Sequence, residues 1–312
     1  MNLDQLHGFS TVAALGHFTR AAEQLHLAQP SLSRQIASLE AELGVELFHR
    51  ARGNIALTAA GERLLPLAKR MLADAETART EMAELAGLRS GRVRLGATPT
   101  LCTSLVAEAL VTFRATYPGI DVEITERGSR TLIGTLADGG LDLALIVDTD
   151  AAPAGAVAML DRTPLVTEQL VVVSATSGSK TGEPISLSEL ARMPQIMFPD
   201  GYDLHATMSR AFAAADLTPT TAVRGAEMDA SLRFVERGLG VAVVPAMVAL
   251  DRPSLHTRPL ADPSLARTVS IARRADMTLT HAGAAMRDTL ARTAEQLSQT
   301  DAHSGRFVSR PH

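Results

Sequence analysis

The stretch FTRAAEQLHLAQPSLSRQIASLE, residues 18–40, decides the fold of the N-terminal part of the chain. Thr19 suits the N-cap of a first short helix, in which small and apolar residues up to Leu25 share one face. A short turn over residues 26–28 follows, and Pro30 suits the first turn of a second helix. The pattern predicts two short helices joined by a tight turn.

The second of these helices has an apolar face and a polar face. Leu32, Ile36 and Leu39 recur at helical spacing and are expected to face inward. The residues left on the outside are Ser31, Ser33, Arg34, Gln35 and Ser38. In the major groove, arginine pairs with guanine and glutamine with adenine, and serines let the backbone approach phosphates closely. The helix therefore suits DNA recognition, although an ordinary helical hairpin with a solvated polar face has the same pattern.

The segment after the second helix favours the DNA-binding interpretation. Gly44 is expected to end that helix. Residues 50–54, RARGN, then lie between two apolar segments, as a β-wing would. In a wing, Arg50 and Arg52 would contact phosphate or the minor groove.

A long helical stretch without any strand signal follows, from residue 58 to about residue 89. Thr58 suits its N-cap, and Pro66 is expected to bend it about two turns in. Small and apolar residues recur at alternating steps of four and three, which is a heptad seam: Leu64, Ala68, Met71, Ala75, Ala78, Met82 and Leu85. A long surface helix packed on its own domain would give the same pattern. A dimer seam is preferred, because no strand lies nearby in the sequence for the helix to pack on.

From residue 91 onward, β-type runs alternate with helical runs, which predicts an α/β fold. Expected strands cover residues 92–97, 120–125 and 141–146, with helices over 101–116 and 130–137. A second lobe is expected from about residue 165, with strands over 170–173, 195–198, 222–225 and 241–244 and helices over 204–214 and 229–237. The chain is expected to return to the first lobe through residues 267–273 and a helix over 282–297, before a polar and frayed tail.

Ligands of open sheets bind beyond the carboxyl ends of the strands. Thr98 and Thr100 follow the first strand, with Ser104 nearby, and offer hydroxyls to a carboxylate or another anion. Further candidate effector-binding residues lie at comparable loop positions: Ser129, Val147, Phe198, Tyr202, His205, Met228 and Val244. For each of them a capped helix, ordinary core or loop surface is the alternative. Arg127 and Arg130 either pair with an acidic effector or stay solvated.

The run AAEQLHLAQPSLSRQIASLE at residues 21–40, with LGVELFHR at 43–50 and LTAAG at 57–61, closely resembles the N-terminal domain of LysR-type transcriptional regulators. The resemblance covers residues 3–65 almost without a gap, and the later α/β pattern resembles the family less specifically. It implies a winged helix-turn-helix over residues 1–58, a dimerising linker helix over 59–89, and a two-lobed effector domain like periplasmic binding proteins over 90–312. Lobe I would comprise about residues 90–163 and 265–300, and lobe II about residues 164–264.

For function, the resemblance implies sequence-specific transcription regulation controlled by a small-molecule, anionic effector. The DNA-binding candidates are Thr19, Gln29, Pro30, Ser31, Ser33, Arg34, Gln35, Arg50 and Arg52. The implied partners are double-stranded DNA, the effector, RNA polymerase and further copies of the chain, in a homodimer or homotetramer. No arginine follows the 141–146 strand, where some regulators of aromatic catabolism place one, and the single Cys102 excludes a two-cysteine peroxide switch.

Composition limits how such a protein holds DNA. The chain has 312 residues, enough for two or more domains, and its formal net charge of −4 excludes a polycation that coats nucleic acid. Residues 1–58 carry four arginines and no lysine against five acidic residues, so binding must rest on placed arginines and two-fold repetition. With no secretory signal and no apolar run of membrane length, we expect a cytoplasmic protein without cofactor or metal.

An enzyme and a small-molecule binding protein are the competing interpretations. The sequence has no nucleophile elbow, no phosphate-cradling glycine loop and no metal-spaced histidine pair, and Gly238 with Gly240 lacks the third glycine of a dinucleotide motif. A binding protein would leave residues 1–89 unexplained. We therefore expect a regulator and not an enzyme.

Overall fold

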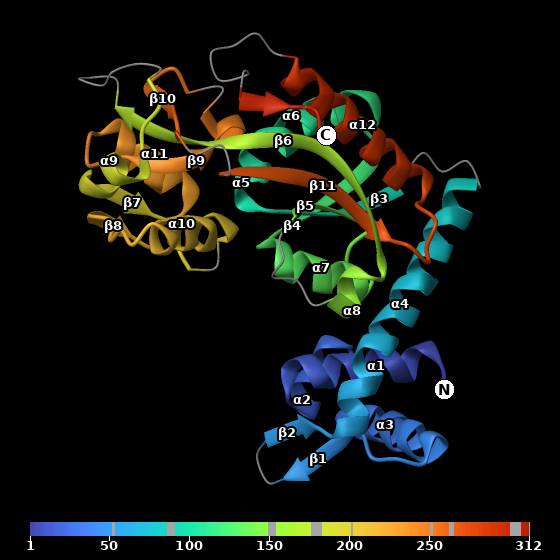
Figure 1. Cartoon of the computed structure of the whole chain (residues 1–312). Coiled ribbons are helices and arrows are strands. Elements are labelled where there is room, and N and C mark those ends of the chain that lie inside the picture. Colours follow the sequence, from blue (N-terminus) through green and yellow to red (C-terminus); the bar gives the residue numbers. More distant parts are fainter. Residues whose placement is uncertain are drawn as a thin grey trace. The chain divides into compact units, whose positions relative to one another are not determined.

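The computed structural model describes residues 1–51, 54–85, 91–148, 154–175, 183–200, 202–249, 252–261, 265–299 and 307–311. The chain divides into two compact units, the first made chiefly of residues 1–88 and the second of residues 89–136 and 141–312. Figure 1 labels the elements of both units, which are described separately below.

The first unit contains the predicted helix-turn-helix and wing. Its elements are α1 (Leu3–Leu15), α2 (Phe18–Gln24), α3 (Gln29–Leu43), β1 (Phe48–Ala51), β2 (Asn54–Leu57) and α4 (Ala59–Leu85). β1 and β2 form an antiparallel hairpin in which Phe48 pairs with Leu57. This arrangement confirms the fold expected for the N-terminal part of the chain.

The core of the first unit explains why the apolar spacing in α3 predicted its inner face correctly. Leu32, Ile36 and Leu39 are fully buried. Phe9 of α1 packs on Phe48 of the wing with ring centroids 5.4 Å apart. Aromatic contacts of this kind add to the apolar area removed from water, so they fix the wing against the helices.

Three capping residues were predicted for helices of the first unit, and one of these predictions was wrong. His17, and not Thr19, occupies the N-cap of α2, so Thr19 lies inside the first turn. Gly44 is the C-cap of α3, with a φ of 71° that favours glycine. Thr58 caps α4 as expected: its Oγ1 accepts from the Gly61 amide at 3.1 Å.

The second unit is built on one eight-stranded mixed sheet and a separate two-stranded one. The strands are β3 (Gly91–Ala97), β4 (Ile120–Glu126), β5 (Leu143–Val147), β6 (Leu160–Ala175), β7 (Gln195–Met197), β8 (Thr221–Arg224), β9 (Ala242–Pro245), β10 (Leu255–Pro259), β11 (Ala266–Arg274) and β12 (Val308–Ser309). The helices are α5 (Pro99–Leu101), α6 (Ala107–Thr116), α7 (Ser129–Ala137), α8 (Ala154–Val157), α9 (Leu187–Arg192), α10 (Asp203–Ala214), α11 (Met228–Glu236) and α12 (His281–Ser298), with a 3-10 turn over Ala246–Ala249. The strand order is β10-β6-β11-β5-β3-β4, with β9 and β12 also paired to β6.

β6 is the strand that connects two groups of elements, which we call lobe I and lobe II. Lobe I comprises β3 to β5, α5 to α8, β11 and α12, and lobe II comprises α9 to α11 and β7 to β10. The first part of β6, Leu160–Gln169, pairs with β11, and its last part, from Leu170, pairs with β9 and β10. Figure 1 shows β6 running from one group into the other.

The continuity of β6 corrects the expected strand over residues 170–173. The strand is 16 residues long, so the expected lobe boundary at 163/164 falls inside it. The sequence pattern predicted only the apolar second half of this strand. Residues 161–164, near its start, are exposed and give no apolar signal. A strand that is exposed at one end and buried at the other shows no single periodicity.

The expected helix over residues 101–116 is interrupted. α5 is followed by a π-helical turn, Cys102–Val106, before α6 begins. The Ser104 hydroxyl donates to the Thr100 carbonyl at 2.7 Å, and the Thr103 hydroxyl donates to the Pro99 carbonyl at 3.3 Å. Hydroxyls that bond to nearby backbone carbonyls compete with the amide ladder, which accounts for the irregular turn.

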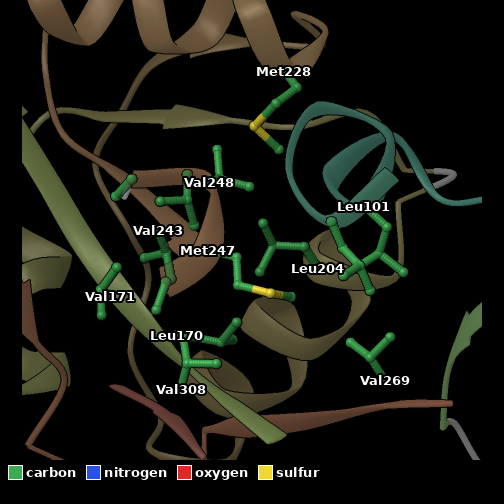
Figure 2. Close-up of a cluster of buried hydrophobic side chains, with 14 of the residues drawn as sticks. Leu101, Leu170, Val171, Leu204, Met228, Val243, Met247, Val248, Val269 and Val308 are labelled. Atoms are coloured by element: carbon green, nitrogen blue, oxygen red, sulfur yellow. The ribbon is translucent and has the colours of Figure 1, made fainter. Parts of the chain in front are cut away.

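The tail was expected to be frayed, and for residues 307–311 this was wrong. β12 pairs with β6, Val308 opposite Glu168 and Ser309 opposite Thr167. Phe307 and Val308 are buried. Figure 2 shows Val308 among apolar side chains of the core that come from β6, β9 and β11. Burial of two apolar side chains therefore offsets the entropy cost of ordering the segment.

Candidate functional site

The start of α3 presents polar side chains to solvent. Gln29, Pro30 and Arg34 are exposed, while Ser31 and Ser33 are half-buried. Within the described part of the chain, the Arg34 guanidinium has no hydrogen-bond or ion-pair partner. An unpaired arginine on a helix is free to reach a guanine edge or a phosphate.

Gln35 lies differently from the prediction, which placed it on the outer face. It is half-buried, and its Oε1 atom is buried without a hydrogen-bond partner among the residues described. A Cβ atom added at Gly8 of α1 would lie 3.5 Å from this oxygen, so the amide packs toward α1. Ile36 is its buried neighbour in the sequence, and Gln35 therefore sits at the border of the buried face.

The remaining DNA-binding candidates are only partly described. Thr19 is exposed on α2. Arg50 belongs to β1, but its side chain is outside the described residues. Arg52 also lies outside the described residues. The structure thus brings the α3 candidates together on one helix and leaves the contribution of the wing as a prediction.

The heptad positions of α4 fall into two classes. Ala68 is fully buried, and Leu64 and Met71 pack against the core of the same unit, so these three hold α4 to its own domain. Ala75 is half-buried, and Ala78 and Met82 are exposed, Met82 to 59%. The Leu85 side chain is outside the described residues. A seam between chains is therefore left to the second half of α4.

A cavity of about 350 Å³ lies between the two lobes of the second unit, and we call it the interlobe cavity. Its lining residues are Thr98, Pro99, Thr100, Glu126, Arg127, Gly128, Pro199, Tyr202, Asp203, Leu204, Glu227 and Arg267. The volume falls within the range typical of small-molecule sites. Of the predicted effector-binding residues, three line the cavity: Thr98, Thr100 and Tyr202.

The two predicted threonines belong to a buried chain of hydrogen bonds. Arg267 Nη2 donates to Thr100 Oγ1 at 2.9 Å, and Thr100 Oγ1 lies 3.2 Å from Thr98 Oγ1. Arg267 also pairs with Glu168, Nη2 to Oε1 at 2.8 Å, and the Met247 amide donates to the other oxygen of Glu168 at 2.9 Å. Since arginine only donates, Thr100 accepts from Arg267, and either threonine hydroxyl can donate to the other.

The two threonine hydroxyls share one hydrogen bond, which uses one of their two protons. Whichever threonine donates, the other hydroxyl proton has no acceptor among these three side chains. Both threonines are buried, Thr98 to 4% exposure and Thr100 to 2%. A buried donor without a partner is costly, so an acceptor in the interlobe cavity would be stabilised there.

Ser129 and Val147 support the interlobe cavity without lining it. The Ser129 hydroxyl donates to Asp203 Oδ2 at 2.7 Å and accepts from the Val147 amide at 3.0 Å. Ser129 belongs to lobe I and Asp203 to lobe II, so this contact links the lobes. Ser129 is fully buried, and its hydroxyl already bonds to these two partners, so its contact with an effector stays a prediction.

Phe198 and His205 position Tyr202 at the edge of the interlobe cavity. The Phe198 and Tyr202 rings stack with centroids 5.6 Å apart. His205 Nδ1 is 2.9 Å from the Phe198 carbonyl, and its Nε2 is 3.3 Å from Asp200. The Tyr202 hydroxyl donates to Glu227. Burial, followed by this hydrogen bond and the charge of Glu227, raises the pKa of Tyr202, so its hydroxyl stays protonated.

The prediction that Met228 and Val244 contact the effector is not supported, because both are core residues. Met228 is 3% exposed and Val244 is fully buried. Figure 2 shows Met228 with Leu204 and Val248 in the apolar cluster. Val244 pairs with Val171 of β6. Both side chains therefore face the interior of the second unit and do not line the interlobe cavity.

Sequence reasoning missed Glu126, Asp203, Glu227 and Arg267 among the lining residues. Glu126 ends β4, so the rule that ligands gather at carboxyl ends of strands would have found it. Glu227 is the N-cap of α11. Arg267 lies in β11, 167 residues from Thr100, and no local signal marks it. Arg127 lines the interlobe cavity as an exposed residue, whereas Arg130 does not line it.

Cys102 lies just after the threonines and is half-buried. Burial first, then the charge of Glu126 and a hydrogen bond to it, raise the pKa of the Cys102 thiol to about 12. The folded protein therefore holds the unreactive thiol form at neutral pH.

We expect the native chain to resist alkylation at Cys102. At pH 8 a thiol with a pKa of about 12 is ionised in about one molecule in ten thousand, against roughly a quarter for an unperturbed thiol. Iodoacetamide labelling followed by mass spectrometry should be at least about a hundredfold slower in buffer than in urea. The native rate should rise about tenfold per pH unit up to pH 10. Equal rates for folded and unfolded chain would contradict this assignment.

No group of histidine, cysteine and acidic side chains suited to a metal ion occurs among the described residues. In the same part of the chain, no helix is long and apolar enough to cross a membrane.

Two family models match the chain in the order of its units. The bacterial regulatory helix-turn-helix protein model of the lysR family covers residues 3–62, and the LysR substrate binding domain model covers residues 86–295. The chain belongs to the LysR family of transcriptional regulators. The second model alone spans more than half of this LysR regulator, and its range includes every lining residue of the interlobe cavity.

Individual relatives agree with the family assignment. This LysR regulator is 31% identical to a probable nitrogen assimilation transcriptional activator of Synechococcus elongatus, over 87% of this chain and 88% of that one. It is also 31% identical to a probable hydrogen peroxide-inducible genes activator of Streptomyces viridosporus, over 88% of each. Full-length OxyR from Pseudomonas aeruginosa has a similar structure, with a TM-score of 0.69, 27% identity and coverage of 93% of this chain and 98% of that one. These relatives are regulators and not enzymes, as expected.

Proposed function

We propose that this LysR regulator binds operator DNA through the start of α3 and that a small molecule with an anionic group controls it from the interlobe cavity. The observation that carries the proposal is the donor chain, the hydrogen-bonded side chains of Arg267, Thr100 and Thr98, which lines a cavity of small-molecule size. An anion would accept a hydrogen bond from the threonine hydroxyl whose proton is left over.

The DNA contact is proposed for the exposed residues at the start of α3 and for Arg50 and Arg52 of the wing. Arg34 supports it most directly, because it is exposed and unpaired within the described ranges. Since the whole chain has a formal net charge of −4, one subunit holds DNA weakly. Two subunits would double the number of arginines on the operator.

Self-association is proposed through the second half of α4, where Ala78 and Met82 are exposed. Small side chains there let two helices approach closely. A homodimer would present two α3 helices to two half-sites, and two dimers would form a homotetramer. Such a regulator would act in the cytoplasm and change the access or contacts of RNA polymerase at its promoter.

Peroxide sensing, which the name of one relative suggests, is not favoured here. The chain has one cysteine, and no second thiol is available for an intramolecular disulfide. The raised pKa of Cys102 also keeps that thiol unreactive.

A gel-shift titration of the DNA upstream of the protein's own coding sequence tests the proposal. We expect sequence-selective retardation with two protected half-sites in a footprint, and an affinity that falls steeply with salt because phosphate contacts release counterions. Adding excess unrelated DNA should leave the specific complex intact. Retardation equal for all fragments would contradict operator recognition.

A further inference from the structure

The acidic side chains of the interlobe cavity are not used by the proposed anion site. The titratable lining groups that carry charge are Glu126, Asp203, Glu227, Arg127 and Arg267. Asp203 accepts from Ser129, and Arg267 is paired with the fully buried Glu168. Arg127 is exposed, and its Nη1 atom donates to the Glu126 main-chain carbonyl at 2.7 Å. Of the acidic groups, Glu126 and Glu227 remain, and neither side chain has an ion-pair partner in the described part of the chain.

Glu126 and Glu227 come from different lobes but lie near the same point, the Tyr202 hydroxyl. That hydroxyl donates to Glu227, and the charge of Glu126 also acts on it. Two carboxylates beside one neutral hydroxyl form a region of negative potential. A cation placed between them would be attracted by both lobes at once.

The region of negative potential adjoins the donor chain. Glu126 is paired in register with Ala97, the residue before Thr98, on the neighbouring parallel strand. Adjacent strands lie about 4.8 Å apart, so the residues that follow them start side by side. The carboxylate acceptors and the hydroxyl and guanidinium donors therefore lie close enough for one small molecule to contact both. Such a molecule would carry a positive and a negative charge.

We propose that the effector is a small zwitterion, one of the common α-amino acids with a free ammonium group. This inference rests on the proposed function. Its carboxylate accepts from Thr98 and from Arg267, whose Nη1 atom makes no hydrogen bond to the described residues. Its ammonium group donates to Glu126 and Glu227. A dicarboxylate is disfavoured, because its second charge would meet these carboxylates and because Glu168 already offsets the charge of Arg267.

The test is a thermal-shift screen of the full chain with each of the twenty common L-α-amino acids at 10 mM, followed by calorimetric titration. We expect at least one to raise the melting temperature, since a ligand that binds only the folded state stabilises it. Its N-acetyl derivative and its deaminated acid, matched in size, should bind at least about tenfold more weakly, because each lacks the ammonium charge. Stabilisation by none of the twenty, or equal binding of the deaminated acid, overturns the inference.

Two variants and a control locate the ammonium group. Glu126→Gln and Glu227→Gln keep an acceptor for Cys102 and Tyr202 but remove the charge, and each should weaken binding of the amino acid at least about tenfold. Glu123→Gln, an exposed change on the same strand, should leave binding unchanged. Unchanged affinity in both site variants overturns the inference.

The gel-shift titration separates this inference from the proposed function. If operator binding is selective but only anions without an ammonium group bind the protein, the zwitterion is wrong and the regulator stands. If operator binding fails, the proposed function fails, whatever the amino acids do.

Discussion

Replacing Arg34 with alanine is expected to abolish selective operator binding while leaving the fold intact. The side chain is exposed and has no partner in the described part of the molecule, so its loss costs the first unit no internal contact. A bidentate contact to guanine is worth about 1–3 kcal/mol, and a dimer loses two of them. Gel shift should therefore show an affinity lower by roughly a hundredfold or more, with unchanged circular dichroism.

The control is Arg287→Ala, which removes the same charge from α12 of the second unit. Arg287 is exposed and pairs with its neighbour Asp288, and such surface pairs contribute little. Its operator affinity should stay within about twofold of that of the unaltered protein. If Arg34→Ala bound the operator as well as Arg287→Ala does, the assignment of α3 as the recognition helix would be wrong.

Replacing Arg267 with methionine is expected to destabilise the second unit by about 3–5 kcal/mol, because it leaves the charge of Glu168 buried and unpaired. The Glu168 side chain is completely buried and that of Arg267 is 10% exposed, so water does not compensate. Urea unfolding should show a lower midpoint with an unchanged slope, which is the signature of a stability change alone.

Two further variants test this explanation. Arg267→Met combined with Glu168→Met removes both charges and should recover part of the lost stability, since an apolar pair replaces an orphaned charge. Arg162→Met breaks a pair in the same sheet that is 39% and 37% exposed, and should cost at most about 1 kcal/mol. A double variant less stable than the single one would contradict the buried-charge argument.

Local pattern was enough to predict the first unit. The spacing of Leu32, Ile36 and Leu39 defined the inner face of α3, and glycine at residue 44 marked its end. Such signals lie within a few residues of the structure that they predict. The prediction that Thr19 caps α2 was wrong, because the N-cap is set by where the chain enters the helix. The residue types alone do not determine that position. The fully outward orientation expected for Gln35 was wrong, because this residue lies at the border between the two faces of α3.

The second unit depended on contacts between distant residues. The approximate strands and helices followed from alternation, but the length of β6 and the docking of Val308 are products of pairing across the sheet. The residues of the interlobe cavity likewise divide into those that local sequence predicted and those that it did not. Thr98 and Thr100 were found from their place after a strand, whereas Arg267 reaches them from another strand late in the chain. Candidates chosen by loop position alone, such as Met228, turned out to face the core.

Because β6 runs unbroken through both lobes, any closure around a ligand must twist a hydrogen-bonded ladder, since no slack loop is available there to rotate about. A hydrogen-bonded ladder resists twisting elastically, so the closing movement of the lobes is small. Each further degree of twist takes up more of the ligand's binding free energy. The concentration at which the regulator responds is then set partly by the stiffness of β6, β11 and β12. Substitutions in these strands, remote from the ligand, would retune sensitivity without changing which molecule is recognised.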